Sequence, residues 1–318
     1  MSQIRSEDYP FGITLIDVDY GRPSLAASYL LLEGDCAAFI ETGTSLSVPA
    51  LLRVLAAKGV AREQVEYVIP THVHLDHAGG AGALLQQLPN ARLVVHPRGA
   101  RHLIDPSKLI AGAAAVYGEE ELKRGHGEIV PVPAARVIEA GDGFSVDLNG
   151  RRLLFLDTPG HARHHFCVVD EAGHGIFTGD TFGISYREFD TERGAFIFPT
   201  TTPVQFDPEA MHASIDRLMG YQLRYMYLTH FGRVGDLMRL AGDLHEQIDQ
   251  LVAIARELAG AGAQRHALLL ERLQQEMVAR ARAHGCELPE TRMRDLLAMD
   301  MGLNAQGLEV WIDSQRSA

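Results

Sequence analysis

The stretch THVHLDH, residues 71–77, places three histidines and an aspartate directly after the apolar run VEYVI, residues 65–69. A short apolar run of this kind predicts a buried β-strand. Imidazole nitrogens and carboxylate oxygens are the ligands that zinc and iron take in proteins. Because four such residues within six positions are rare at this composition, we predict that His72, His74, Asp76 and His77 form a metal site.

Three later strand ends carry single candidate ligands. TPGH (158–161) and FTGD (177–180) each join a predicted strand to a turn containing glycine, and LTH (228–230) repeats the arrangement. A lone histidine at a strand end is more often a hydrogen-bonded residue than a ligand. Since all three ends follow the first motif, we assign His161, Asp180 and His230 to the metal site as well.

The rest of the chain predicts an α/β fold, because strands and helices alternate from the N-terminus to residue 232. Apolar runs predict strands at 13–20, 28–41, 65–69, 92–95, 144–148, 152–156, 166–169, 175–177 and 225–228. Helical spacing is found at 48–58, 80–88, 102–122 and 207–219. From residue 233 onward the apolar spacing is helical throughout, in two long helices, a third opened by Pro289 and a last one carrying Trp311.

The motifs HxHxDH, TPGH, TGD and THFG, in this order, resemble the metallo-β-lactamase superfamily, and especially its glyoxalase II-like branch, over about residues 10–232. The resemblance implies an αββα sandwich as catalytic domain (1–232), and the helical spacing that follows predicts 233–318 as a helical appendage packed on it. The resemblance also implies a binuclear site in which Asp180 bridges one metal held by His72, His74 and His161 and a second held by Asp76, His77 and His230. Class B1 β-lactamases are less similar, since they have Arg in place of His77 and Cys in place of Asp180.

Other residues are expected near these ligands. Glu41 precedes Thr-Gly where the family usually has Asp, so we expect it to support the site from a longer side chain. His165 lies where the family often has a further histidine, and we expect it to orient a ligand. The other histidines are expected to have no role in the site. Candidates for a substrate pocket, with a solvated loop as the alternative, are Thr181, Ser185, Tyr186 and Arg187.

The chemistry that follows is hydrolysis. Two bridged cations lower the pKa of a shared water to about 7, which gives a hydroxide nucleophile, and they polarise the bond under attack. Asp76 is the candidate catalytic residue, because a carboxylate can hold the hydroxide and later pass a proton to the leaving group. We expect an activated acyl bond of a small molecule, thioester, lactone or ester. Two divalent ions are expected as cofactors, zinc first, with iron and manganese as alternatives.

Two other functions are kept open. Persulfide dioxygenases resemble this fold but use one iron held by two His and one Asp, whereas all seven ligand positions are filled here. A regulatory protein that keeps its metals without turnover is the third alternative. Metal content distinguishes the first two.

Composition limits the partners. The net charge of −12 over 318 residues argues against nucleic acid, whose binding depends on clustered Lys and Arg. No apolar run is long enough for a membrane span, and the first nine residues lack the apolar core of a signal peptide. Three scattered cysteines suggest neither disulfides nor a thiolate site. We expect a cytoplasmic enzyme whose C-terminal helices form a lid or a homodimer contact.

Overall fold

The computed structural model describes residues 5–316, and its contacts divide the chain into two compact units. The first unit comprises the described residues up to Asp157, together with His164–Gly179 and Leu223–Arg233. The second comprises Thr158–Arg163, Asp180–Gln222 and the residues from Val234 onward. Among residues 5–316 no helix is both long and apolar enough to cross a membrane.

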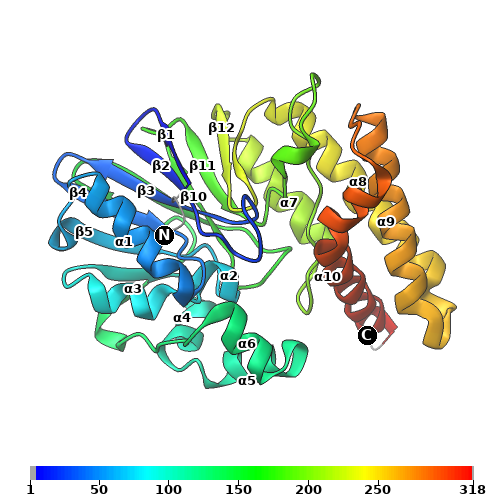
Figure 1. Cartoon of the computed structure of the whole chain (residues 1–318), viewed down its shortest axis with the longest axis horizontal. Helices are drawn as coiled ribbons and strands as arrows, with labels where there is room; N and C mark the ends of the chain where they lie inside the picture. Colours follow the sequence, from blue (N-terminus) through cyan, green and yellow to red (C-terminus); the bar gives the residue numbers. More distant parts are fainter. Residues whose placement is uncertain (1–4, 317–318) are drawn as a thin grey trace. The chain divides into compact units, whose positions relative to one another are not determined.

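Two mixed sheets form the first unit (Figure 1). The first sheet is antiparallel from β1 to β4 and parallel from β4 to β7. Its strands, in spatial order, are β1 (Ser6–Tyr9), β2 (Ile13–Asp17), β3 (Ala27–Glu33), β4 (Cys36–Ile40), β5 (Val65–Ile69), β6 (Arg92–Val95) and β7 (Val137–Glu139).

The second sheet is antiparallel from β8 to β11, and β11 pairs with β12 in parallel. Its strands, in spatial order, are β13 (Gly232–Val234), β12 (Tyr225–Leu228), β11 (Gly175–Gly179), β10 (Phe166–Asp170), β9 (Arg151–Asp157) and β8 (Ser145–Leu148). The strands β1, β7 and β13 were not predicted from the sequence.

The core lies between the two sheets, because alternate residues of each strand point to one face. Ala27, Tyr29 and Leu31 of β3 are buried there, as are Leu153 and Phe155 of β9. This packing of two mixed sheets confirms the predicted metallo-β-lactamase sandwich class, and the chain adds C-terminal helices to it.

Helices of the first unit follow the prediction in part. They are α1 (Val48–Ala57), α2 (Leu75–Ala78), α3 (Ala81–Gln87), α4 (Pro97–Ile104), α5 (Ser107–Tyr117) and α6 (Glu119–His126). The single helical stretch expected at 102–122 is wrong, since three short helices occupy this region. Asp105 is extended before Pro106, and Gly118 adopts a positive φ of 82°, so the backbone leaves the helical conformation at both places.

The second unit is mostly helical and contains α7 (Pro208–Met219), α8 (Leu237–Glu257), α9 (Arg265–Ala283) and α10 (Glu290–Arg316) (Figure 1). The helix α7 begins as predicted, with the Asp207 side chain accepting a hydrogen bond from the Ala210 backbone N–H. The two helices expected after Pro289 are wrong: α10 is continuous. Gly307 lies within this helix, and glycine is required there because a Cβ would overlap the carbonyl of Thr201.

The C-terminal helices are tied to the segment that follows Asp180. The Tyr186 hydroxyl donates to Asp300 on α10 at 3.0 Å, and the Gln247 amide on α8 donates to the Ile197 carbonyl at 2.8 Å. These helices are therefore integral to the unit that contains Asp180. The functional division at residue 232 stays a prediction.

Candidate metal centre

The residues that follow β4 and β5 lie at one edge of the first sheet, because these two strands are parallel and end on the same side. Glu41 follows β4, and Thr71 and His72 follow the neighbouring β5. The Glu41 backbone N–H donates to Ile69 at 3.0 Å, which fixes this alignment. Thr229 and His230 follow β12 in the second sheet.

Three of the predicted ligands form a triangle within the first unit. The Asp76 Oδ2 atom lies 3.5 Å from His77 Nε2 and 3.4 Å from His230 Nε2. The two Nε2 atoms are 3.4 Å apart. Asp76, His77 and His230 can thus offer one ligand atom each to a common ion.

The outer nitrogens of these two histidines are already held. His77 Nδ1 lies 3.0 Å from Glu41 Oε1, and His230 Nδ1 lies 2.7 Å from the Leu25 carbonyl oxygen. Both partners are acceptors, so each Nδ1 carries the proton. The Nε2 atoms of His77 and His230 therefore carry lone pairs, and these lone pairs are directed at each other and at the Asp76 carboxylate.

A metal ion fits this triangle by distance. Zinc binds imidazole nitrogen at about 2.0–2.1 Å, and a tetrahedral site then separates neighbouring donors by roughly 3.3 Å. The observed separations are 3.4–3.5 Å. Three acceptor atoms repel one another at this spacing, and a cation among them removes the repulsion.

Glu41 is buried next to the group of Asp76, His77 and His230, with only 1% of the residue exposed. Its Oε1 accepts from His77 Nδ1 at 3.0 Å, from the Thr71 hydroxyl at 2.5 Å and from the Thr229 hydroxyl at 3.0 Å. Its Oε2 accepts from the Thr71 backbone N–H at 3.1 Å. The Glu41 side chain thus contacts the candidate ligand His77 directly. It also holds Thr71 and Thr229, which precede the candidate ligands His72 and His230.

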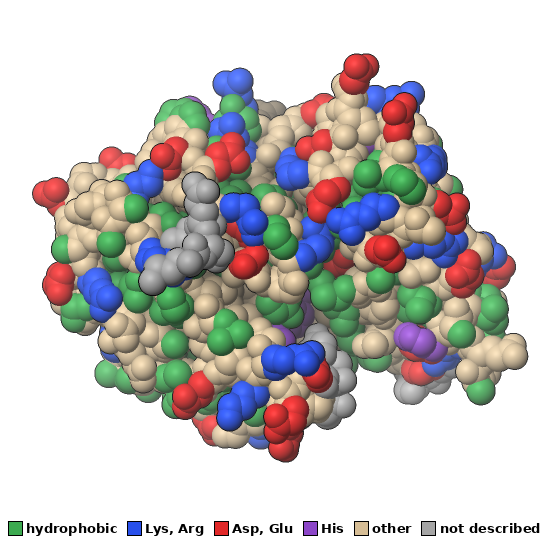
Figure 2. Space-filling view, viewed as in Figure 1, with side chains coloured by type: hydrophobic (Ala, Val, Ile, Leu, Met, Phe, Trp, Pro, Cys, Tyr) green, Lys and Arg blue, Asp and Glu red, His purple; other side chains and the backbone are tan. Residues whose placement is uncertain are grey.

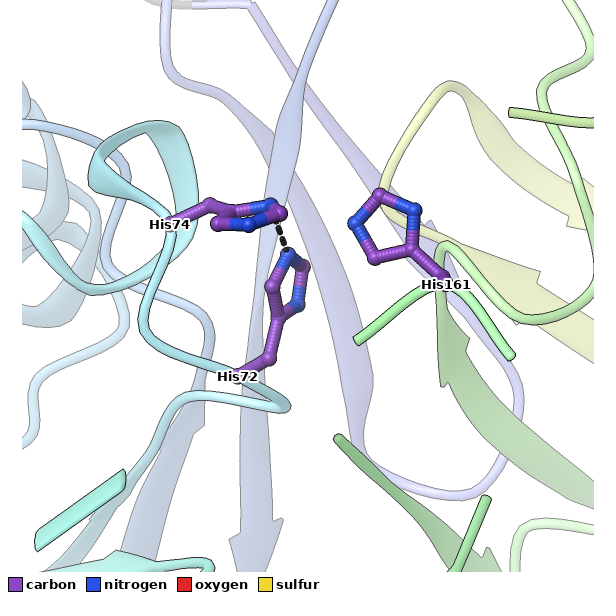
Figure 3. Close-up of side chains that lie close together, drawn as sticks. All are labelled: His72, His74 and His161. Carbon is purple, nitrogen blue, oxygen red and sulfur yellow. Dashed lines mark hydrogen bonds between the residues drawn. The ribbon is translucent and has the colours of Figure 1, made fainter. Parts of the chain in front are cut away.

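Thr71 extends this network to His72. Its hydroxyl proton goes to Glu41, so its oxygen accepts from His72 Nδ1 at 3.1 Å. Because the His72 proton is then on Nδ1, its Nε2 atom carries a lone pair, and this atom lies 2.9 Å from His74 Nδ1. Figure 3 draws these two side chains with that contact dashed, together with His161.

His165 and Gly179 are both close to the same network. The buried His165 ring stacks on the His72 ring with centroids 4.9 Å apart. Gly179 has a φ of 48°, and a Cβ there would lie 2.5 Å from His165 Nε2 and would overlap the Thr71 hydroxyl. Glycine is therefore required immediately before Asp180.

The remaining two predicted ligands belong to the second unit and lie together there. His161 Nε2 is 3.4 Å from Asp180 Oδ2. The turn that precedes His161 is held by α7, since Ser214 Oγ donates to the Pro159 carbonyl at 2.6 Å. The chain itself joins both to the first unit: Asp180 follows Gly179, and 158–163 connects β9 to β10.

The expected pocket residues differ in their contacts. Ser185 and Tyr186 are fully buried, and their hydroxyls donate to the Phe196 carbonyl and to Asp300. These contacts hold both side chains in place within the second unit. The assignment of Thr181, Ser185, Tyr186 and Arg187 to a substrate pocket stays a prediction.

Three residues near the ligands were missed. Thr71 and Thr229 both donate to Glu41, and the repeated Thr-His dipeptide was the signal for them. His164 was assigned no role, yet its ring lies 5.7 Å from that of His74. Burial, reinforced by neighbouring histidines that include His74 and His102, lowers the pKa of His164 to about 3, so it is neutral at physiological pH.

The sandwich and its His and Asp donors define an α/β metal-binding protein. The chain belongs to the metallo-beta-lactamase superfamily, whose family model matches residues 21–230. Its sequence is similar to a metallo-beta-lactamase fold-containing protein, ST1585, from Sulfurisphaera tokodaii, with 29% identity over 67% of this chain and 75% of the relative. A metallo-beta-lactamase family protein from Thermus thermophilus shares the fold, with a TM-score of 0.64 and 21% identity over 96% of this chain and 94% of that one.

Two further relatives carry names of enzymes. An atrochrysone carboxyl ACP thioesterase from Aspergillus fumigatus is 32% identical over 41% of this chain and 31% of its own length. A hydroxyacylglutathione hydrolase from Cupriavidus taiwanensis is 29% identical over 50% of each chain. The match thus spans half or less of these two relatives.

Proposed function

We propose that this protein is a binuclear metal-dependent hydrolase that cleaves thioesters of small molecules, in the manner of the glyoxalase II-like branch. One observation carries the proposal. The protons of His77 and His230 are fixed on Nδ1, so their Nε2 lone pairs converge with Asp76 at metal-ligand spacing.

The seven ligands are proposed to act as two sets. His72, His74 and His161 would hold one ion, Asp76, His77 and His230 the other, and Asp180 both. The chain connections support this, because His161 and Asp180 are each within a few residues of a strand of the first unit. Two divalent ions would supply an ionised water at neutral pH and would polarise the acyl carbonyl.

Asp76 is proposed to move the proton. Its side chain is 24% exposed, whereas that of His77 is fully buried, so Asp76 can meet a substrate. A bond forms between the water oxygen and the acyl carbon, and the carbon–sulfur bond breaks. The carboxylate accepts the proton of the water and returns it to the departing sulfur, which leaves as a thiol.

A thioester is favoured over a lactone or an ester. Relatives are named as a thioesterase and a hydroxyacylglutathione hydrolase. Lactone hydrolases of this superfamily tend to have a tyrosine three residues after the bridging aspartate, where this chain has Gly183. The charge distribution favours a small substrate over a nucleic acid. Acidic and basic side chains are intermingled on the face drawn in Figure 2, and the net charge of the chain is −12.

The test gives the zinc-loaded protein acyl-glutathione, acyl-coenzyme A, lactone and ester substrates, and it measures acid release from all four and thiol release from the two thioesters. We expect release from a thioester, and we expect Asp76→Asn to abolish it. Asp105→Asn, an exposed carboxylate whose contacts are to Ser107, is the matched control. Oxygen consumption with a persulfide and no thioester cleavage would replace the proposal with the mononuclear dioxygenase.

A further inference from the structure

A second cluster of histidines and carboxylates lies outside the metal centre, on α7 and α8 of the second unit. Each helix carries a histidine followed four residues later by an aspartate: His212 and Asp216 on α7, His245 and Asp249 on α8. Residues four apart share one helix face, and the two faces meet because α7 packs on α8.

The four side chains cross between the helices. The imidazole planes of His212 and His245 are nearly parallel, at 13°, and the ring centroids are 4.9 Å apart. His212 Nε2 lies 3.2 Å from Asp249 Oδ1, and His245 Nε2 lies 3.1 Å from Asp216 Oδ1. The two Nδ1 atoms face each other at 2.6 Å.

This arrangement fixes where the protons are. A carboxylate only accepts, so each Nε2 that faces one carries its hydrogen. When both imidazoles are neutral, each has a single N–H, and the two Nδ1 atoms then direct lone pairs at each other across 2.6 Å. Two lone pairs at this distance repel unless a cation lies between them.

We propose that His212 and His245 bind a divalent transition metal, of the zinc, copper or nickel type, through their Nδ1 atoms. Neutral imidazoles suit these ions and not calcium or magnesium, which take oxygen ligands. Each ligand has a carboxylate behind its other nitrogen, as metal-bound histidines usually do. A modest rotation of the rings opens 2.6 Å to the roughly 3.3 Å between donors of one zinc ion.

The site is open to solvent. The side chains of His212 and His245 are 26% and 28% exposed, and those of Asp216 and Asp249 are 74% and 80% exposed. An ion can therefore enter without any rearrangement of the core, and water completes its coordination. The site would link α7 to α8, and α7 also holds the turn that precedes His161.

The experiment is equilibrium dialysis of the metal-loaded protein against zinc, followed by elemental analysis. We expect the His212→Ala/His245→Ala double variant to hold one zinc fewer per chain than the wild type, whatever the metal centre itself contains. His266→Ala is the matched control, because His266 has a carboxylate partner, Glu309, at 2.8 Å and no imidazole among residues 5–316 faces it. It should keep the wild-type zinc count.

A second pair of variants leaves both ligands in place. Asp216→Asn and Asp249→Asn should each weaken zinc binding at this site by about 10 to 100-fold. Thermal unfolding gives an independent readout, since added zinc should raise the midpoint of the wild type more than that of the double variant. Equal zinc counts and equal zinc-dependent midpoints in the wild type and the double variant would overturn the metal site.

Discussion

Replacing Glu41 with glutamine should weaken metal binding, because the carboxylate accepts four hydrogen bonds and an amide cannot. Three donors meet Oε1 and one meets Oε2. If the amide oxygen takes the Oε1 position, the NH₂ group faces the Thr71 backbone N–H. If the amide is flipped, the NH₂ group faces all three donors, including His77 Nδ1.

In the better of the two orientations the amide oxygen still accepts from His77 Nδ1 but carries no negative charge. Mutation of a group that supports a metal-bound histidine in this way typically reduces metal affinity by about 10 to 100-fold. Leaving the Thr71 N–H without an acceptor should also cost about 1–3 kcal/mol of unfolding free energy, because the site is buried. Glu41→Gln should therefore lose both stability and metal affinity.

The assay is competition with a chelator, read by elemental analysis, together with denaturant unfolding. Asp17→Asn is the matched control: Asp17 is 4% exposed and accepts from the backbone N–H groups of Asp19 and Ser24, both at 2.9 Å. It should lose stability and keep its metal affinity. Unchanged metal affinity in Glu41→Gln, or an equal loss of affinity in both variants, would refute the role of Glu41 in orienting the ligands.

The remaining predictions concern the metals and α10. Elemental analysis of the His212→Ala/His245→Ala variant, purified without chelator, should give close to two transition-metal ions per chain, whereas a single iron would contradict the binuclear centre. Asp180→Asn should reduce thioester turnover far more than Glu41→Gln, because it is proposed to contact both ions; equal losses in turnover and metal content would show that the bridge is misassigned. Gly307→Ala should lower the unfolding free energy by about 1–3 kcal/mol, because its Cβ would overlap a backbone carbonyl, whereas Gly302→Ala has open space there and should gain up to about 1 kcal/mol from helix propensity. Denaturant unfolding of the two glycine variants should give opposite signs.

Most strands and all seven candidate ligands could be predicted from the sequence, because both depend on local pattern. The short run at 65–69 is rich in β-branched and aromatic residues, which favours a strand, and its bounds match β5. Ligands that follow such strands are visible as motifs, since the end of a strand and the turn after it lie close together in the chain. The N-terminus of α7 was predicted for the same reason, as Asp207 and Pro208 are local signals.

Only the tertiary structure decided what lies beyond the ligands. Nothing local indicates that Glu41 would meet Thr229, since 188 residues separate them, or that the carboxylate would fix the proton of His77 directly and that of His72 through Thr71. The continuity of α10 was not predicted either, and the close contact of Gly307 with the Thr201 carbonyl is seen only in the tertiary structure. The pairing of His212 with His245 likewise requires α7 and α8 to pack together. Sequence patterns record the period and the ends of each element, whereas hydrogen bonds between distant elements depend on register and packing, which no short stretch of sequence contains.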